Sequence, residues 1–294
     1  MLKSTINFNV KNLLYEIEKE NNIIISRGFK VKEKLFTQIS INPFYCCIDF
    51  NSRKFNWKYF AGELAWYLLQ SRNIKFIKNF SNFWDNLKND DNTINSNYGY
   101  ILFTKNKKTN NSGISWIVNS LKKDKYTRQA IAYFGGKEYQ YEKNKDFVCT
   151  QYILFFIRDN KLYMKVQMRS NDIFYGLTYD AVWFSTVQQN VLFELKNIYP
   201  NLELGNYYHY SDNTHYYERH FDVVKKILQE EITIGPKLVL KEPLWYTYEN
   251  GEIELSFVSK KYLEWFDKNL NKIPELKRKE FLEPLSIIFN IEIS

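Results

Sequence analysis

Hydrophobic side chains recur every three to four residues over several stretches of the chain, which is the spacing of an α-helix with one buried face. This spacing predicts helices over residues 11–21, 57–71, 112–124 and 179–199. It continues through residues 74–90, so we expect that stretch to be helical as well. Residues 90–99, "DDNTINSNYG", are polar and predict a loop, and Pro200 ends the last helix.

A second pattern, rich in β-branched and aromatic residues, predicts strands. The strand candidates are residues 23–50, 129–134, 148–158, 161–170 and 202–211. Polar and apolar residues alternate almost regularly in "KLYMKVQMR", which is typical of a half-buried strand. The "RDNK" at residues 158–161 predicts a hairpin turn between two of these strands.

The chain shows no internal repeat and no linker rich in Pro, Gly or Ser. Beyond about residue 230 the pattern becomes a weaker mixture of strand and helix. With 294 residues, of which 45% are hydrophobic and 18% aromatic, the chain has enough apolar material for one large core. We therefore predict a single α+β domain over residues 1–294.

Charge and cysteine content restrict the possible partners and the cellular compartment. The net charge of +8 favours an anionic partner, from a phosphate ester to a nucleic acid, but lysines scattered over a solvated surface would give the same value. Adjacent Cys46 and Cys47 would need a strained bridge, and an odd count of three leaves one thiol free, which favours a reducing compartment. No stretch resembles a signal peptide or approaches the ~18 apolar residues of a membrane span. We expect a cytoplasmic protein without membrane attachment.

Two neighbouring stretches carry candidate chemistry. Cys149 begins an apolar run, and Arg169 to Asp172 bring together an arginine, a hydroxyl, an amide and a carboxylate. Only a few per cent of a thiol with a pKa near ~8.5 is thiolate at neutral pH, and Arg169 on the adjacent strand could raise that fraction. A buried structural cysteine is the alternative.

Other polar residues suit ligand binding. Arg169 and Ser170 together could grip a phosphate, although an arginine at a strand end also pairs with surface carboxylates. His215 and Tyr217 are two apart, so on a strand both would point to one side and could bind a ligand hydroxyl, or they could be purely structural. Their spacing does not suggest a metal site.

The order of these residues along the chain resembles the thymidylate synthase superfamily. The resemblance runs from about Arg27 to Phe221 and includes "GELAWYL", "NFW", "SNYG", "VCTQ", "RSNDIFYGLTYD" and "THYY". It implies a thymidylate synthase-like α+β domain with a mixed sheet packed against helices, and a homodimer that associates through the sheet face. It also implies 5,10-methylenetetrahydrofolate as cofactor and a nucleoside monophosphate as substrate.

The resemblance assigns roles to residues at matching positions. Cys149, Glu63 and Asp180 would be catalytic, with Cys149 as the nucleophile. Substrate contacts would come from Arg27, Arg169, Ser170, Tyr98, Asp180, His215, Tyr217 and, across the dimer, Arg128. Folate contacts would come from Trp84, Asp172, Gly176 and Glu63. The family has a second arginine after Arg128, whereas this chain has Gln129, which replaces one charge-assisted phosphate contact by a neutral one.

Two departures point to one branch of this superfamily. Thr150 follows the nucleophile where thymidylate synthases usually have histidine, and Asp180 stands where they have the asparagine that reads uracil. A carboxylate complements the exocyclic amine of cytosine. The pattern is similar to that of deoxycytidylate (dCMP) hydroxymethylases. In that branch Cys149 would attack C6 of cytosine, C5 would take up the one-carbon unit, and water would complete a hydroxymethyl group.

Three alternatives remain at this stage. Methylation of dUMP or dCMP in the manner of thymidylate synthase needs a hydride route and a closed pocket, and the final "FNIEIS" does not match the family's closing segment. Hydroxymethylation of CMP is the second alternative. A nucleic-acid-binding protein on a retained catalytic fold is the third, which the charge and the many tyrosines would suit. Whether the product serves DNA modification or a nucleoside pathway is left open, as is whether the cytoplasm is that of a phage host.

Overall fold

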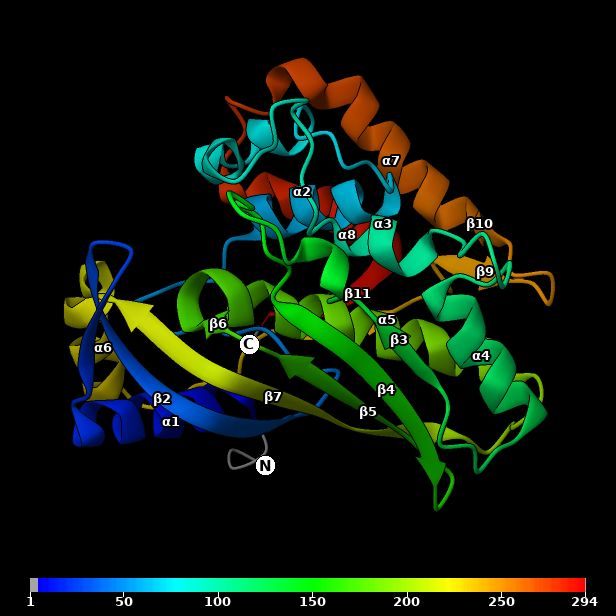
Figure 1. The fold of residues 1–294 in the computed structure, drawn as a ribbon, viewed down its shortest axis with the longest axis horizontal. Coiled ribbons are helices and arrows are strands. Elements are labelled where there is room, and N and C mark those ends of the chain that lie inside the picture. The colour runs from blue at the N-terminus through cyan, green and yellow to red at the C-terminus, as the bar shows by residue number, and fades with distance from the viewer. Residues whose placement is uncertain (1–4, 294) are drawn as a thin grey trace.

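The computed structural model describes residues 5–293. Within this range seven strands form one mixed sheet in the order β1-β2-β7-β5-β4-β3, with β6 paired to β7 (Figure 1). The strands are β1 (Ile23–Ser26), β2 (Phe29–Ile41), β3 (Ile131–Tyr133), β4 (Thr150–Arg158), β5 (Lys161–Met168), β6 (Asn171–Asp172) and β7 (Glu203–Tyr217). β7 runs parallel to β5 and β6, and the other pairs are antiparallel.

Helices are distributed along the whole described part of the chain. They are α1 (Ile6–Glu20), α2 (Trp57–Leu68), α3 (Tyr98–Phe103), α4 (Gly113–Lys123), α5 (Thr178–Lys196), α6 (Phe221–Gln229), α7 (Phe257–Asn269) and α8 (Leu282–Ile288). Short 3₁₀ turns are η2 (Ile77–Asn79), η3 (Asn82–Asn86), η4 (Lys137–Tyr139), η6 (Glu218–His220), η7 (Leu270–Lys272) and η8 (Arg278–Phe281), and η5 (Ile173–Leu177) is a π-turn. The tail adds two small sheets, β9 (Trp245–Thr247) with β10 (Ile253–Leu255) and β8 (Lys237–Leu240) with β11 (Phe289–Glu292).

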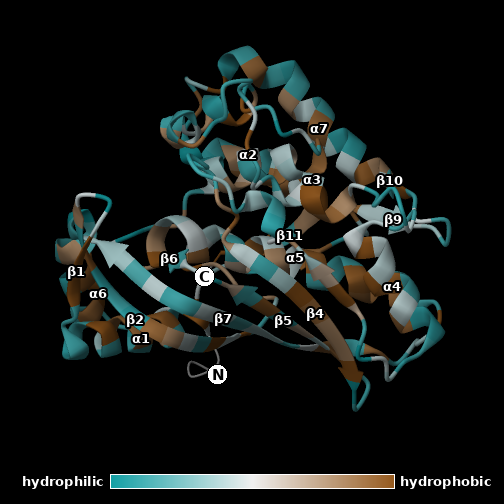
Figure 2. Cartoon of the chain, in the orientation of Figure 1, coloured by the Kyte–Doolittle hydropathy of each residue, from teal (hydrophilic) through white to brown (hydrophobic). Residues whose placement is uncertain are grey.

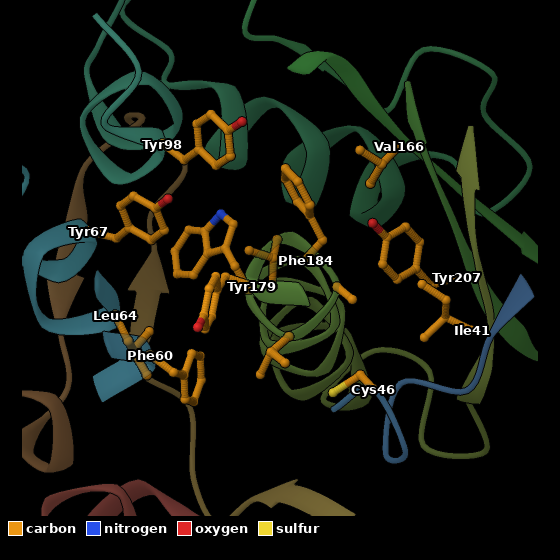
Figure 3. Close-up of a cluster of buried hydrophobic side chains, with 14 of the residues drawn as sticks. Ile41, Cys46, Phe60, Leu64, Tyr67, Tyr98, Val166, Tyr179, Phe184 and Tyr207 are labelled. Atoms are coloured by element: carbon orange, nitrogen blue, oxygen red, sulfur yellow. The ribbon is translucent and has the colours of Figure 1, made fainter. Parts of the chain in front are cut away.

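Helix α5 is the centre of the core. It is buried on nearly every side, because it lies between the sheet and the layer formed by α2, α3 and the tail helices (Figures 1 and 2). Figure 3 shows Tyr67 and Tyr98 on one side of this helix and Tyr207 and Val166 on the other. The buried surface of α5 includes polar side chains such as Gln188 and Asn190, which donate to backbone carbonyls of Leu162 in β5 and Trp245 in β9.

The predicted α+β class is confirmed, and the hairpin at residues 158–161 is present. Arg158 pairs with Lys161, and Asp159 and Asn160 adopt φ angles of 49° and 54°. Two successive residues with positive φ make the type I′ turn that matches the twist of antiparallel strands, and Asn and Asp tolerate it best after glycine.

Two local predictions were wrong, and a third holds except at its C-terminal end. Residues 44–50 form a loop with a single bridge at Phe50, not a strand. Residues 74–90 contain only the turns η2 and η3, so their apolar spacing serves burial without a continuous helix. The predicted loop over 90–99 gives way at Tyr98 to α3, whose N-terminus is capped by the Asn97 side chain accepting from Tyr100 N.

The strand β7 connects the core to the site. Tyr207 and His209 point toward α5, and further along the same strand Asn213, His215 and Tyr217 line a cavity. The buried positions of β7 change from odd to even numbers between Ser211 and Thr214, so the alternation of the strand is interrupted before the residues that line the cavity. No helix among residues 5–293 is both long enough and apolar enough to cross a membrane.

Gly99 allows α3 to pack directly on α2. A Cβ at this position would overlap the Tyr67 carbonyl oxygen and its carbon. We therefore expect Gly99→Ala to lose about 3 kcal/mol of unfolding free energy in a denaturant titration, since backbone cannot move aside as a side chain can. Gly28→Ala is the control, because it has a positive φ of 83° but open space around it, and should lose only about 1–2 kcal/mol. Equal unfolding midpoints for Gly99→Ala and the unmodified protein would contradict this packing.

Candidate active site

A cavity of about 750 Å³ opens beside the N-terminal end of α5. This volume lies within the range of ~300–1,000 Å³ typical of ligand pockets. Twelve of the thirteen predicted site residues line it: Arg27, Glu63, Trp84, Tyr98, Cys149, Arg169, Ser170, Asp172, Gly176, Asp180, His215 and Tyr217. Residues from widely separated parts of the sequence therefore share one enclosure.

Cys149 and Arg169 lie side by side, as the hairpin predicted. Arg169 N donates to the Cys149 carbonyl at 2.9 Å, and its guanidinium lies 3.6 Å from the Cys149 sulfur. The same guanidinium also donates to the carbonyls of Phe147 and Val148, so its position is fixed by backbone. Burial raises the pKa of the Cys149 thiol, and the positive charge of Arg169 opposes that rise without overcoming it. The expected activation by Arg169 is thus present but smaller than the effect of burial.

Glu63 projects from α2 into the cavity and accepts a hydrogen bond from the Tyr59 hydroxyl at 2.8 Å. Burial raises its pKa to about 8, the charge of Asp180 adds to the rise, and the bond from Tyr59 opposes it. The carboxyl of Glu63 therefore holds a proton at neutral pH and can exchange it with a ligand or water.

Asp180 lies in the first turn of α5 and is 8% exposed. Asn171 Nδ2 donates to its Oδ2 at 2.7 Å. A Cβ on Gly176 would come within 2.8 Å of that amide nitrogen, so glycine is needed where the π-turn passes the pair. Burial raises the pKa of Asp180 to about 7, and the Asn171 bond lowers it.

The far wall of the cavity is formed by β7 and the turn after β6. His215 Nδ1 lies 2.9 Å from Asn213 Oδ1, and the His215 ring meets the Tyr217 ring edge-on at 5.4 Å. Asp172 accepts from the backbone N–H groups of Phe174 and Tyr175, so one carboxylate oxygen caps the π-turn. Burial raises the pKa of Asp172, and the positive charge that His215 can carry opposes this rise.

Aromatic residues form the opposite wall. Trp84 is 7% exposed, and its ring lies near the Tyr59 hydroxyl. Its buried N–H has no well-aligned hydrogen-bond acceptor among residues 5–293. Phe80, Phe83 and Leu87 continue this wall. An apolar surface with one buried N–H left unpaired suits a flat heteroaromatic ring that carries acceptor atoms.

Arg128 is the predicted site residue that does not line the cavity. It is exposed in the loop between α4 and β3, at the opposite end of the sheet from β1 (Figure 1). This position agrees with its predicted role only if it reaches the cavity of a second subunit. Arg27, by contrast, lines the cavity of its own chain from the turn after β1, with a φ of 52°.

The structure gives contacts to residues for which the sequence analysis named no role. Tyr59 and Asn171 hold the two carboxylates, and Arg219 lies 4.6 Å from the Tyr217 ring at the cavity wall. Tyr59 is one helical turn before Glu63, and this i to i+4 spacing is a signal that could have revealed it. Asn171 gives no such signal, because its contact with Asp180 depends on the π-turn.

Chemically, the cavity combines a thiol, two carboxyl groups whose pKa values lie near neutrality, and arginines. This set suits nucleophilic attack coupled to proton transfer on an anionic substrate. Among residues 5–293, no group of three or more His, Cys, Asp or Glu is arranged to hold a metal ion.

Comparison with known proteins agrees with this chemistry. The thymidylate synthase family model matches residues 49–257. Deoxycytidylate 5-hydroxymethyltransferase of Enterobacteria phage T6 is 28% identical over 176 residues, which is 58% of this chain and 70% of that protein. Thymidylate synthase 1 of Bacillus amyloliquefaciens is 25% identical over 228 residues, covering 76% of this chain and 95% of that protein.

A solved structure shows the same fold. The thermostable thymidylate synthase A from Bacillus subtilis superposes with a TM-score of 0.67 at 21% identity, covering 86% of this chain and 95% of the other. The predicted resemblance and the thymidylate synthase-like fold are therefore confirmed. Since the family match extends over more than half of its length, this chain belongs to the thymidylate synthase family of folate-dependent one-carbon transferases, which use 5,10-methylenetetrahydrofolate as the one-carbon donor.

Proposed function

We propose that the protein converts dCMP to 5-hydroxymethyl-dCMP through a covalent adduct with Cys149. The observation that carries this proposal is the fixed orientation of the Asp180 carboxylate. Asn171 holds Oδ2 by a hydrogen bond of 2.7 Å, which leaves Oδ1 available to accept from a ligand. The phage hydroxymethyltransferases among the relatives support the same substrate.

Cytosine and uracil differ at the edge that Asp180 would meet. Cytosine presents an N4 amine, which donates, next to N3, whereas uracil presents the O4 carbonyl, which accepts. An ionised carboxylate can only accept hydrogen bonds, so it pairs with the N4 amine and repels O4. If N3 gains a proton during attack at C6, the same carboxylate stabilises the positive charge that develops on the base.

The other residues would have separate roles in the reaction. Cys149 Sγ forms the bond to C6, which makes C5 nucleophilic. Glu63, protonated at neutral pH because burial raises its pKa to about 8, would deliver and recover protons and orient the attacking water. The folate, when bound, supplies the carbon that C5 receives. Trp84, Asp172, Gly176 and Glu63 line the part of the cavity proposed to hold it.

Substrate positioning would rely on the basic side of the cavity. Arg27, Arg169 and Ser170 would bind the phosphate, and His215 and Tyr217 would bind the sugar 3′-hydroxyl. Tyr98, stacked on Tyr67 with ring centroids 5.6 Å apart, would border the nucleotide. A nucleotide so placed would have its base over Cys149 and its phosphate at Arg169, whose guanidinium lies 3.6 Å from the thiol sulfur.

A homodimer through the sheet face completes this proposal. The face of β4, β5 and β7 directed away from α5 carries half-buried Tyr152, Tyr163, Tyr208 and Tyr210, and Lys165 lies 4.3 Å from the Tyr210 ring. Tyrosine enrichment of this kind is typical of protein interfaces. Dimerisation here would let Arg128 of the partner subunit contribute to the phosphate site.

One other activity has specific support. Thymidylate synthases of several Bacillus species match this chain at 25–27% identity, close to the 28% of the phage hydroxymethyltransferases. Methylation of dUMP is therefore the second candidate. It would require O4 of uracil to face a protonated Asp180, since only the neutral carboxyl can donate a hydrogen bond.

The deciding experiment measures tritium release from C5-labelled dCMP, dUMP and CMP in the presence of 5,10-methylenetetrahydrofolate. We expect release from dCMP and a product heavier by one hydroxymethyl group in mass spectrometry. Release from dUMP with a methylated product would instead establish the second candidate. Cys149→Ser should lower release by at least ~10³-fold, because the serine hydroxyl is not appreciably ionised at neutral pH. Cys46→Ala, which removes a thiol outside the cavity, should retain release.

Replacing Asp180 by asparagine should invert the choice of base. Asn171 would hold the amide oxygen of the new side chain, so its N–H₂ group would face the base and match O4 of uracil. We expect kcat/KM for dCMP to fall by ~10–150-fold, the equivalent of losing one charge-assisted hydrogen bond, while dUMP binding improves.

The matched control is Asp222→Asn, which changes an exposed aspartate on α6 outside the cavity. Competition between the two nucleotides in one reaction gives the ratio of kcat/KM directly. An unchanged ratio in Asp180→Asn would mean that this carboxylate does not read the base.

A further inference from the structure

Behind Asp180, three buried polar side chains continue away from the cavity into the core. Asn171 Oδ1 lies 3.2 Å from His209 Nε2, and His209 Nδ1 lies 2.5 Å from the Tyr207 hydroxyl. Asp180, Asn171, His209 and Tyr207 are 8%, 3%, 3% and 0% exposed. The four side chains thus form one chain of hydrogen bonds that leads from Asp180 at the cavity to Tyr207 in the core.

The direction of this chain of hydrogen bonds follows from which of its atoms can donate a proton. An ionised Asp180 only accepts, so Asn171 must present its N–H₂ to it and its oxygen to His209. His209 must then carry its proton on Nε2, which leaves Nδ1 free to accept from the Tyr207 O–H. Burial lowers the pKa of His209 to about 3, so the ring is neutral and one nitrogen is available as acceptor. Each of the three contacts in this arrangement then joins one donor to one acceptor.

The reversed arrangement leaves one group without a partner. If Asp180 were protonated and donated to Asn171, the amide would turn over, His209 would carry its proton on Nδ1, and Tyr207 would have to accept. No other acceptor for the Tyr207 O–H is present among residues 5–293, apart from His209. A buried hydroxyl without an acceptor is costly, so Tyr207 and His209 hold Asn171 with its N–H₂ toward Asp180, and this donor at Oδ2 favours the ionised carboxylate.

We propose that Tyr207 and His209, acting through Asn171, are positioning residues that hold the Asp180 carboxylate in place and keep it ionised. The consequence of this arrangement for the choice of cytosine rests on the function proposed above. Tyr207, His209 and Asn171, called the relay below, oppose the effect of burial, which favours the neutral acid. The relay would keep Asp180 an acceptor at the pH where the thiol and Glu63 operate.

Other charged and titratable groups also face Asp180 and must be held constant in any test. Glu63 and Tyr67 face it from α2, Tyr98 from α3, and Cys149 from the start of β4. None of these groups is altered by a change at Tyr207, which lies on β7 on the side of α5 away from Tyr67 and Tyr98 (Figure 3). A shift caused by Tyr207→Phe therefore reports on the relay.

The test is a titration of the Asp180 carboxyl by ¹³C NMR in the nucleotide-free protein, with the signal assigned by its loss in Asp180→Asn. In the unmodified protein we expect a midpoint near 7. In Tyr207→Phe the midpoint should rise by about one pH unit. Without the Tyr207 hydroxyl, both directions of the hydrogen-bond chain leave Nδ1 of His209 unpaired, so neither direction is favoured. The control is Tyr262→Phe, which removes another buried O–H bond, to Ala61 O at 2.8 Å, on the tail helix α7.

Tyr262→Phe should lower the melting temperature without moving the Asp180 midpoint. Identical midpoints in Tyr207→Phe and Tyr262→Phe would overturn the proposal. If Tyr207→Phe does not fold, His209→Gln and His209→Leu replace it. The glutamine amide can still donate to Asn171 and accept from Tyr207 and should preserve the midpoint, whereas leucine should raise it. Equal midpoints in these two variants would also overturn the relay.

Activity separates the relay from the proposed function. As pH falls through the pKa of Asp180, the carboxyl gains a proton and loses its capacity to accept from N4. The acid limb of kcat/KM for dCMP should therefore move upward with the NMR midpoint in Tyr207→Phe. A moved midpoint with an unmoved limb would leave the relay standing and contradict the role of Asp180 in reading cytosine.

Discussion

The turn at Asp159 and Asn160 fixes the register of β4 against β5 as far as Tyr152, and a bulge between Thr150 and Tyr152 then shifts it by one residue. The geometry of the site depends on both features. Because side chains alternate along a strand, a slip of one residue would turn the inward-facing set to the other side. The observed pairing ends with Arg169 N bound to the Cys149 carbonyl, so the thiol and the guanidinium meet where the two strands leave the sheet. β7 then runs parallel to β5 and brings His215 and Tyr217 to the same edge.

Burial is the common cause of the unusual protonation in this site. It raises the pKa of Cys149, Glu63 and Asp180 together, since each charged form loses water when α2, α5 and the sheet close around the cavity. Three groups that could each be negative cannot all ionise in one small volume without counter-charge. Arg169 and neutral donors such as Tyr59 and Asn171 decide which of them do. The protonation state of the site is therefore set as much by these hydrogen-bonding neighbours as by the three groups that line the cavity.

Sequence reasoning succeeded where a local rule and the tertiary fold agreed. The "RDNK" turn follows from Asn and Asp at positions with positive φ, and His215 and Tyr217 share a side because strands have a period of two. It failed where tertiary packing overrode the local pattern. Residues 74–90 have helical spacing but form only two 3₁₀ turns, and "FYCCIDF" has strand composition but lies in a loop held by Asn7 and Asp49. His209 could not be recognised from the sequence, because a histidine among tyrosines on a strand gives no sign of a partner 38 positions earlier.

Whether Asp180 accepts or donates a hydrogen bond depends on its neighbours as much as on the residue itself. A carboxylate placed alone in a buried pocket takes up a proton, because burial destabilises the charged form more than the neutral acid. The protonated oxygen then donates a hydrogen bond instead of accepting one. A donor directed at one of its oxygens reverses that preference, and the donor must in turn be prevented from turning over. Asn171 supplies the first requirement, and its contact with His209 addresses the second. Glycine at 176 gives the amide the room to reach Asp180 at all. The ionised form of Asp180 therefore depends on these neighbours, so the whole set, and not the aspartate alone, makes this part of the cavity a hydrogen-bond acceptor.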